Sequence, residues 1–286
     1  MEESERMKII ITGGEGQLGR ELVRQLSGRY QVYGLGKSQL DITRKDEVDN
    51  IVSLINPNVI IHTAAYTAVD QCETQIMKAF NINGLGTGYV ANASSKVGAR
   101  LIYISTDYVF DGNSKAEYQE NVIPNPQSIY GMSKWLGEQL TINLCNGTVI
   151  RTSWLYGHGG KNFVNTLINL AYRDKEIRVV NDQIGSPTYV NDLAETIIRL
   201  LDKKNGIYHV TNSGYCSWYD FAKAIFIEKN FDHNKIKPIS SENFGAIAQR
   251  PKFSVLGHNS LIREGINPLR HWKEALKDYI RKENFR

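Results

Sequence analysis

The sequence has few cysteines, no long apolar run and no dense run of basic residues, which are the features of disulfide-stabilised, membrane-spanning and nucleic-acid-binding proteins. Its 286 residues include three cysteines (Cys72, Cys145 and Cys216), which are widely spaced and form no Cys-x-x-Cys pair, so they favour a reducing cytoplasm over a disulfide-stabilised fold. No apolar run approaches the roughly 18 residues of a membrane span. No run of Lys and Arg is dense enough to indicate a nucleic-acid stripe. Residues 1–6 are acidic and lack an apolar core, so we expect no signal peptide.

The composition is otherwise that of a globular chain of about two domains. Hydrophobic residues make up 41% and charged residues 22%, which is too rich in core-forming residues for disorder. The formal net charge is only +4. An anionic partner must therefore be bound by a few well-placed cations and not by a general positive field.

Short apolar runs alternate with amphipathic stretches in the first half of the chain. The runs at 8–12, 31–35, 59–62, 99–105 and 147–152 predict strands, and the stretches at 18–26, 45–55, 76–96 and 133–143 predict helices. Alternation at this pace is typical of βαβ units. We therefore predict an α/β fold with a Rossmann-type, doubly wound parallel sheet.

The alternation changes after Trp154. Helices are predicted at 162–173, 193–201, 218–229 and 271–281, strands at 178–180 and 206–210, and a polar loop at 181–188. Without a flexible linker, the two parts must be interleaved. We expect a dinucleotide-binding domain from 7–157 plus about 190–230, and a small substrate-binding domain from about 158–189 plus 231–286.

A glycine-rich segment follows the first predicted strand. Gly13, Gly16 and Gly19 are spaced Gly-x-x-Gly-x-x-Gly directly before a predicted helix. Residues without a Cβ let the backbone approach a pyrophosphate, and the helix N-terminus supplies N–H groups for its negative charge. The segment predicts dinucleotide binding, the alternative being a plain tight turn.

The choice of dinucleotide depends on the end of the second strand. An acidic residue there would bond the ribose 2′-hydroxyl and repel a 2′-phosphate. The sequence from Val32 to Ser38 has no Asp or Glu, and Lys37 offers a cation instead. This favours NADPH, although Lys37 is equally compatible with an ordinary solvated lysine.

A tyrosine and a lysine form a candidate acid–base unit. Tyr130 and Lys134 are spaced i, i+4, which places both on one face of a helix. A nearby ammonium is expected to lower the pKa of the phenol and suit it to carbonyl–alcohol interconversion. Thr106 follows the fourth apolar run, at the edge of the sheet where ligands bind. A chance surface pair is the alternative.

The combination of Gly13-x-x-Gly16-x-x-Gly19, Thr106 and Tyr130-x-x-x-Lys134 resembles the extended short-chain dehydrogenase/reductases. Further segments resemble, within them, the dTDP-4-dehydrorhamnose reductase family over nearly the whole chain. These segments are Ala64-Ala65-Tyr66-Thr67-Ala68-Val69-Asp70, Ser105-Thr106-Asp107-Tyr108-Val109-Phe110, Arg151 to Gly157, Asn181 to Thr188, and Arg250-Pro251.

The resemblance implies a role for each of these positions. Thr106 would bond the 4-keto oxygen of a dTDP-4-keto-6-deoxy sugar, with Asp107 beside it. Tyr130 would protonate that oxygen, Lys134 would hold the nicotinamide ribose, and Trp154 would pack on the sugar or the nicotinamide. Cofactor residues would be Gly13, Gly16, Gln17, Leu18, Gly19, Lys37, Asp41, Ile42, Ala65, Tyr66 and Thr67. The family prefers NADPH and often accepts NADH. The resemblance is also compatible with a homodimer, and no carboxylate cluster calls for a metal.

Other residues and other functions stay open at this point. Arg250 would either clamp a diphosphate or close the substrate domain structurally. Gln183 and Thr188 would reach the nucleotide or merely form a turn, whereas His62 and the aromatic residues at 215–221 are expected in the core. One alternative function is a sibling nucleotide-sugar 4-ketoreductase of different epimer specificity. Another is a non-catalytic NADP-binding regulatory subunit like that of methionine adenosyltransferase.

Overall fold

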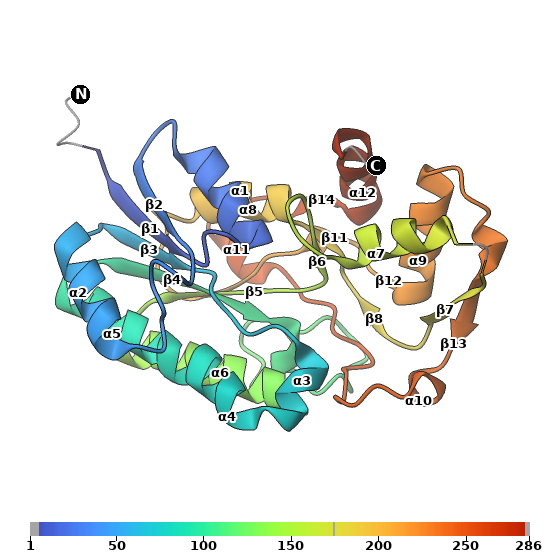
Figure 1. Cartoon of the computed structure of the whole chain (residues 1–286), viewed down its shortest axis with the longest axis horizontal. Coiled ribbons are helices and arrows are strands. Elements are labelled where there is room, and N and C mark those ends of the chain that lie inside the picture. Colours follow the sequence, from blue (N-terminus) through green and yellow to red (C-terminus); the bar gives the residue numbers. More distant parts are fainter. Residues whose placement is uncertain (1–5, 174, 284–286) are drawn as a thin grey trace.

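The larger half of the molecule is built on a six-stranded parallel sheet. The computed structural model describes residues 6–173 and 175–283. Residues 1–5, which belong to the segment where we expect no signal peptide, lie outside the described residues. The strand order is β10-β5-β4-β3-β1-β2, and every neighbouring pair is parallel. Figure 1 labels β1 to β5 of this sheet. The strands are β1 (Lys8–Thr12), β2 (Gln31–Leu35), β3 (Val59–His62), β4 (Arg100–Thr106), β5 (Thr148–Thr152) and β10 (Ile207–His209). The predicted doubly wound sheet is confirmed.

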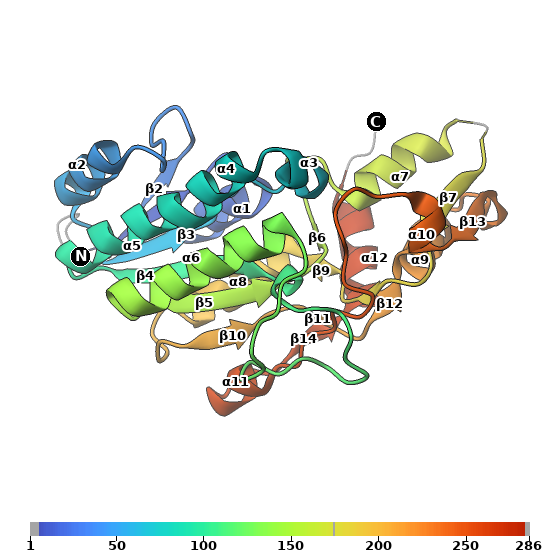
Figure 2. The same cartoon turned by 90° about the horizontal axis from the view of Figure 1, so that it is seen from below.

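Helices cover both faces of this sheet (Figure 2). One layer contains α2 (Lys45–Ile55), α5 (Thr87–Lys96) and α6 (Ile129–Cys145), and the other α1 (Gln17–Leu26), α8 (Val190–Arg199) and α11 (Asn259–Arg263). The alternation of side chains along β1 separates two cores. Ile9 and Ile11 pack towards α1 and α8, whereas Ile10 packs towards α2 and α5.

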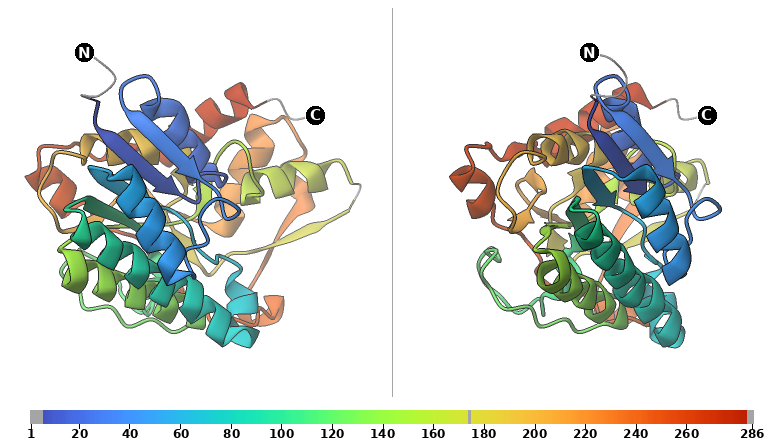
Figure 3. Two further views of the ribbon diagram at one scale, coloured as in Figure 1. Left: turned by 60° about the vertical axis from the view of Figure 1, so that its left-hand side comes forward. Right: turned by 90° about the vertical axis from the view of Figure 1, so that its left-hand side faces the viewer.

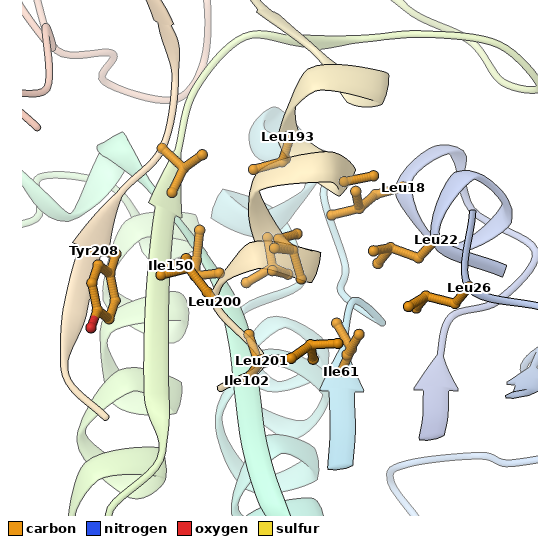
Figure 4. Close-up of a cluster of buried hydrophobic side chains, with 14 of the residues drawn as sticks. Leu18, Leu22, Leu26, Ile61, Ile102, Ile150, Leu193, Leu200, Leu201 and Tyr208 are labelled. Atoms are coloured by element: carbon orange, nitrogen blue, oxygen red, sulfur yellow. The ribbon is translucent and has the colours of Figure 1, made fainter. Parts of the chain in front are cut away.

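The first of these cores seals the helix that follows the glycine-rich loop. Leu18, Leu22 and Leu26 recur at helical spacing on α1 and point towards the sheet and α8 (Figure 4). Leu22 and Leu26 are fully buried. This packing fixes the direction of α1 and therefore where its N-terminus points.

The predicted helix 76–96 has a more complex course. It consists of α4 (Ile76–Ala79), a π-helical segment (Phe80–Gly86) and α5, and it is preceded by α3 (Val69–Thr74), which the sequence did not predict. Inside the π-helical segment, the Asn83 amide accepts a hydrogen bond from Tyr66 N (2.7 Å) and donates to Tyr66 O (3.0 Å). A π-bulge inside a helix is frequent at functional sites.

The smaller lobe packs beside the carboxyl ends of the sheet strands (Figure 3). Its helices are α7 (Phe163–Ala171), α9 (Trp218–Glu228), α10 (Ser241–Phe244) and α12 (Trp272–Lys282). Short strand pairs complete it and join it to the larger lobe: β7 (Ile177–Val180) with β13 (Ile236–Ile239), β6 (Leu155–Tyr156) with β9 (Thr188–Tyr189), β8 (Ile184–Gly185) with β12 (Cys216–Ser217), and β11 (Asn212–Ser213) with β14 (Leu269–His271). Two 3₁₀ turns lie at Asp107–Val109 and His233–Lys235.

Two expectations about secondary structure were wrong in detail. The helix predicted at 133–143 begins at Ile129, because the Ser128 hydroxyl caps it by accepting a hydrogen bond from Gly131 N (3.1 Å). The segment 181–188 is not simply a loop, since β8 and the start of β9 lie within it. The earlier start of α6 matters for function because it brings Tyr130 into the same helix as Lys134.

Packing also suggests where the two lobes divide. Helix α9 packs in the core of the smaller lobe with α7 and α12, whereas Leu261, Ile266 and Leu269 join the core of the larger lobe. We therefore propose that α9 belongs with the substrate-binding lobe and that 259–269 belongs with the dinucleotide-binding lobe. The predicted division assigned these two segments the other way round.

Three further observations concern residue classes discussed above. Cys72, Cys145 and Cys216 are free thiols. In the part of the chain that the structure describes, no helix is long and apolar enough to cross a membrane. Within 6–173 and 175–283, no three His, Cys, Asp or Glu side chains gather where they could hold a metal ion.

Candidate active site

The glycine-rich loop forms a close turn between β1 and α1. Gly13 has a φ of +67°, and a Cβ there would lie 2.8 Å from the backbone of Ala64. At Gly19 a Cβ would lie 2.8 Å from Gly14 Cα, so the helix packs on the loop without room for a side chain. Gly16 is the N-cap of α1, and a Cβ there would lie 3.2 Å from Gly13 O. The loop and the helix N-terminus therefore fit a dinucleotide pyrophosphate.

A cavity of about 920 Å³ opens at the carboxyl ends of the sheet strands. Its walls come from the glycine-rich loop, the ends of β2 to β5, helix α6 and residues of the smaller lobe. The predicted site residues that line it are Gly13, Gly16, Gln17, Leu18, Gly19, Lys37, Asp41, Ile42, Ala65, Tyr66, Thr67, Thr106, Asp107, Tyr130, Lys134 and Trp154. Of the residues that the sequence offered for ligand contact, Arg250, Gln183 and Thr188 do not line this cavity. A cavity of this size, at this edge of the sheet, suits a dinucleotide with a second ligand beside it.

Thr106, Asp107 and Tyr130 form one hydrogen-bonded cluster in the cavity wall. The Thr106 hydroxyl donates to Asp107 Oδ1 (3.0 Å) and also makes a hydrogen bond with the Tyr130 hydroxyl. Burial raises the pKa of the Asp107 carboxyl to about 6 and raises the pKa of the Tyr130 phenol above its usual value. Tyr130 is therefore a neutral phenol at physiological pH, with its proton available for transfer.

Lys134 is buried one helical turn from Tyr130. Its Nζ donates to Ile104 O (2.6 Å) and lies 4.2 Å from the centre of the Tyr103 ring. Burial lowers the pKa of Lys134 to about 7, and the carboxylate of Glu138 opposes that shift. The expectation that Lys134 lowers the pKa of Tyr130 was wrong for this structure. Burial dominates at Tyr130, and the ammonium is bonded to the backbone of β4 instead.

A buried ion pair lies directly behind the Thr106 cluster. Glu138, on α6, accepts hydrogen bonds from Arg151 Nε (2.9 Å) and Nη2 (2.7 Å), and Ser105 Oγ donates to the same carboxylate (2.5 Å). Both charged side chains are at most 1% exposed. The pair ties α6 to the carboxyl ends of β4 and β5, and so holds Thr106 in place relative to Tyr130.

Two tryptophans face each other where the lobes meet. The rings of Trp154 and Trp218 are stacked with centroids 3.6 Å apart, and both residues line the cavity. The aromatic residues at 215–221 were expected in the core. Phe221 is buried as expected, whereas Tyr215 is 57% exposed and Trp218 belongs to the cavity wall. Ser217 caps α9 through a capping box with Asp220.

Arg250 does not line the cavity. Its guanidinium forms a two-pronged ion pair with Asp70, at 3.0 Å and 2.7 Å, and makes a further hydrogen bond with Tyr108. Asp70 also accepts a hydrogen bond from Ala248 N (3.0 Å). These contacts support the structural reading of Arg250, in which it fastens the segment around Ala248 to the start of α3.

The other candidates for nucleotide contact also lie outside the cavity wall. Gln183 donates to Ser241 Oγ (2.9 Å), and Thr188 is fully buried at the start of β9. His62 is fully buried, as predicted, with its two ring nitrogens hydrogen-bonded to Thr12 Oγ1 (2.6 Å) and Thr87 Oγ1 (3.1 Å). Burial lowers the pKa of His62 to about 3, so it is a neutral core residue.

Several cavity residues were not found by the sequence analysis. They include Glu15 in the glycine-rich loop, Tyr108 after β4, and Trp218 of the smaller lobe. An acidic residue inside a glycine-rich loop was a visible signal for Glu15. Trp218 carried no such signal, because only the packing of the lobes brings it to the cavity.

Comparison with known proteins adds to this geometry. Residues 7–285 match the family described as the RmlD substrate binding domain. The spore coat polysaccharide biosynthesis protein SpsK of Bacillus subtilis is 46% identical over 279 residues, covering 97% of this chain and 98% of that protein. A dTDP-4-dehydrorhamnose reductase of Aggregatibacter actinomycetemcomitans is 42% identical over 287 residues, covering 95% of this chain and 97% of that protein.

A solved structure resembles the fold over nearly its whole length. The dTDP-4-dehydrorhamnose reductase of Bacillus anthracis, crystallised in complex with NADP, has a TM-score of 0.95 and 47% sequence identity with this chain. The match covers 97% of this chain and all of that one. The similarity therefore includes both lobes and the cavity between them.

Proposed function

This chain belongs to the family of the RmlD substrate binding domain, and we propose that it reduces the C4 keto group of dTDP-4-dehydro-6-deoxy-L-mannose to give dTDP-L-rhamnose. It is an NAD(P)H-dependent oxidoreductase, and two of the relatives named above are dTDP-4-dehydrorhamnose reductases. The observation that carries the proposal is the cluster of Thr106, Asp107 and Tyr130, which lies in the same cavity as the glycine-rich loop.

A nicotinamide cofactor, when bound in this cavity, would supply the hydride. Tyr130 donates a proton to the oxygen of the former keto group as charge develops there. Thr106 hydrogen-bonds the same oxygen and so holds the carbonyl in the orientation that the reaction requires. Burial keeps the phenol of Tyr130 protonated until an oxygen of higher basicity forms beside it.

The remaining residues bind and orient. Gly13, Gly16 and the N-terminus of α1 would hold the pyrophosphate. Lys134, whose Nζ now donates to Ile104 O, would bond the nicotinamide ribose. A ribose hydroxyl would take over part of the bonding that Ile104 O now provides. Trp154 packs on the sugar or the nicotinamide ring. NADPH is the proposed cofactor, supported by the NADP complex of the Bacillus anthracis relative.

We also place this reaction in the cytoplasm, which the three free thiols support. We further propose that the chain forms a homodimer.

The test is turnover of freshly generated dTDP-4-keto-6-deoxy-L-mannose with NADPH, comparing the intact chain with Tyr130→Phe. We expect the variant to lose about 10²–10⁴-fold in kcat, because the proton donor is gone, while its Kd for NADPH stays within about twofold. Tyr172→Phe is the matched control and should keep full activity, because Tyr172 is 65% exposed and does not line the cavity.

Other outcomes would redirect the proposal. Turnover to a different C4 epimer would indicate a sibling nucleotide-sugar ketoreductase with the same mechanism. Tight NADPH binding without any oxidation, in the intact chain, would contradict the reductase and favour the non-catalytic regulatory subunit.

A further inference from the structure

The end of β2 carries no side chain where a dinucleotide site usually has a carboxylate. Strand β2 ends at Leu35 and is followed by Gly36 and Lys37. In Rossmann folds an acidic residue in this region bonds the adenine ribose, and its negative charge disfavours a 2′-phosphate. From sequence alone, Lys37 was therefore the sole charge for choosing between NADH and NADPH.

A carboxylate from another segment of the chain lies at the end of β2. A Cβ built on Gly36 would lie 2.6 Å and 2.7 Å from the two carboxylate oxygens of Glu15. Glu15 belongs to the glycine-rich loop, twenty-one positions earlier in the chain, and is exposed. Glu15, Gly36 and Lys37 all line the same cavity. The absence of a side chain at Gly36 is what leaves room for the Glu15 carboxylate at the end of β2.

The Glu15 carboxylate has its bonding capacity free for a ligand. Among residues 6–173 and 175–283, no side chain or backbone N–H forms a hydrogen bond or ion pair with it. Its backbone carbonyl, in contrast, accepts a hydrogen bond from Arg20 Nε (2.8 Å), which fixes the loop. The carboxylate is thus positioned by the loop and available to accept hydrogen bonds from vicinal hydroxyl groups.

The opposing cation is less firmly held. Lys37 is 82% exposed, and its Nζ lies 4.0 Å from Asp41 Oδ2, at the edge of ion-pair distance. A 2′-phosphate that approached Lys37 would also come close to Glu15, and the like charges would repel each other. A 2′-hydroxyl in the same place would instead donate to Glu15.

We propose that Glu15 is a specificity-determining residue, which takes the place of the missing acid at the end of β2, bonds the adenine ribose hydroxyls and thereby admits NADH while weakening NADPH. The inference rests on the proposed function in so far as that function requires a nicotinamide cofactor. It predicts a dual-cofactor enzyme in which Lys37 and Glu15 act in opposite directions.

The test is equilibrium binding of NADPH and NADH, each titrated separately into the full-length chain, with the fluorescence of the reduced nicotinamide as readout. In Glu15→Gln the Kd for NADPH should fall and the Kd for NADH should rise, so that their ratio changes by about tenfold or more. The change in the NADPH Kd should shrink as the ionic strength increases, because salt screens exposed charges.

Asp46→Asn is the matched control. Asp46 is exposed in the first turn of α2, three residues after Thr43 of the cavity lining, and does not line the cavity itself. The substitution removes the same charge. Both Kd values should stay within about twofold, which separates a specific contact of Glu15 from a general effect of net charge.

The outcomes are distinguishable. If the intact chain binds both cofactors and Glu15→Gln leaves the ratio of the two Kd values unchanged, the role of Glu15 is refuted and the proposed reductase stands. If Asp46→Asn shifts the ratio as much as Glu15→Gln does, the specific contact is likewise refuted. If the intact chain binds neither cofactor, both this inference and the proposed function fail.

Discussion

Tyr130 and Lys134 share one face of α6, and burial moves their pKa values in opposite directions. It raises the pKa of Tyr130 and lowers the pKa of Lys134 to about 7, because in each case the charged form loses solvation. Both shifts favour the neutral side chain in the ligand-free protein. The phenol therefore keeps the proton that the proposed reaction needs. An anionic cofactor bound in the cavity would favour the charged form of Lys134.

His62 offers a residue-scale test of how burial affects stability. Its pKa in the folded protein is about 3, against about 6.5 in the unfolded chain, so the unfolded chain binds more protons between these values. The stability that the protein gains by keeping His62 neutral is therefore fully present above pH 6.5, and it is lost as the pH falls towards 3. The titration of His62 alone should lower the free energy of unfolding by about 2 kcal/mol between pH 8 and pH 5.

The measurement is the free energy of unfolding in urea at pH 8 and pH 5, for the intact chain and for His62→Gln. The intact chain should lose about 2 kcal/mol more than the variant over this range. Equal losses in the two proteins would show that His62 titrates normally in the folded state.

At the scale of elements, the buried pair of Glu138 and Arg151 fastens α6 to β4 and β5. In Glu138→Gln the guanidinium of Arg151 would remain buried without its counter-charge, which should cost about 3–5 kcal/mol of stability. Glu176→Gln breaks an exposed pair with Arg178 and should cost less than about 1 kcal/mol. Urea unfolding of both variants measures the difference, and a loss at Glu138 no larger than that at Glu176 would contradict the role given to the pair.

Elements of the larger lobe could be predicted because local pattern determines them. The predicted ranges 8–12, 31–35, 45–55 and 59–62 coincide with β1, β2, α2 and β3, whose apolar runs or helical spacing are visible within a few residues. The pairing of β7 with β13 joins Ile177 to Ile236 across a long stretch of chain, and no local pattern encodes it. The π-helical segment was missed for a related reason, since Asn83 bonds to Tyr66, which lies outside the helix.

The residues of the candidate site also divide into those that a local pattern reveals and those that only the fold reveals. Tyr130, Lys134 and the glycines were found because their spacing along the chain carries the chemistry. Trp218 was missed because its position depends on which segments the fold brings together. Glu15 was overlooked although it lies inside the glycine-rich loop, because its approach to Gly36 is visible only in the fold. Arg250 was given a possible ligand role that its contacts with Asp70 do not support.

At the scale of the whole molecule, the cavity lies between two lobes that contribute different residues. The larger lobe supplies the glycine-rich loop and the cluster of Thr106, Asp107 and Tyr130. The smaller lobe supplies Trp218, which is stacked on Trp154. We expect Trp218→Ala to raise the KM for the nucleotide sugar about tenfold through lost aromatic contact, with the Kd for NADPH nearly unchanged.

Steady-state kinetics with the nucleotide sugar and separate NADPH titrations would measure the two effects. Tyr215→Ala is the control, since this exposed residue precedes the same helix without lining the cavity. A rise in the Kd for NADPH without a rise in the KM for the nucleotide sugar would show that Trp218 contacts the cofactor. That result would contradict the assignment of Trp218 to the binding of the sugar.

The central claim is that this cavity transfers a hydride to C4 of a dTDP-4-keto-6-deoxy sugar while Tyr130 supplies the proton. The most direct measurement uses NADPH deuterated at the transferred hydride, followed by NMR of the isolated nucleotide sugar. The account predicts dTDP-L-rhamnose with a single deuterium at C4 from the intact chain, and about 10²–10⁴-fold slower formation from Tyr130→Phe. Deuterium retained entirely in the cofactor, or transfer at the same rate in Tyr130→Phe, would contradict it.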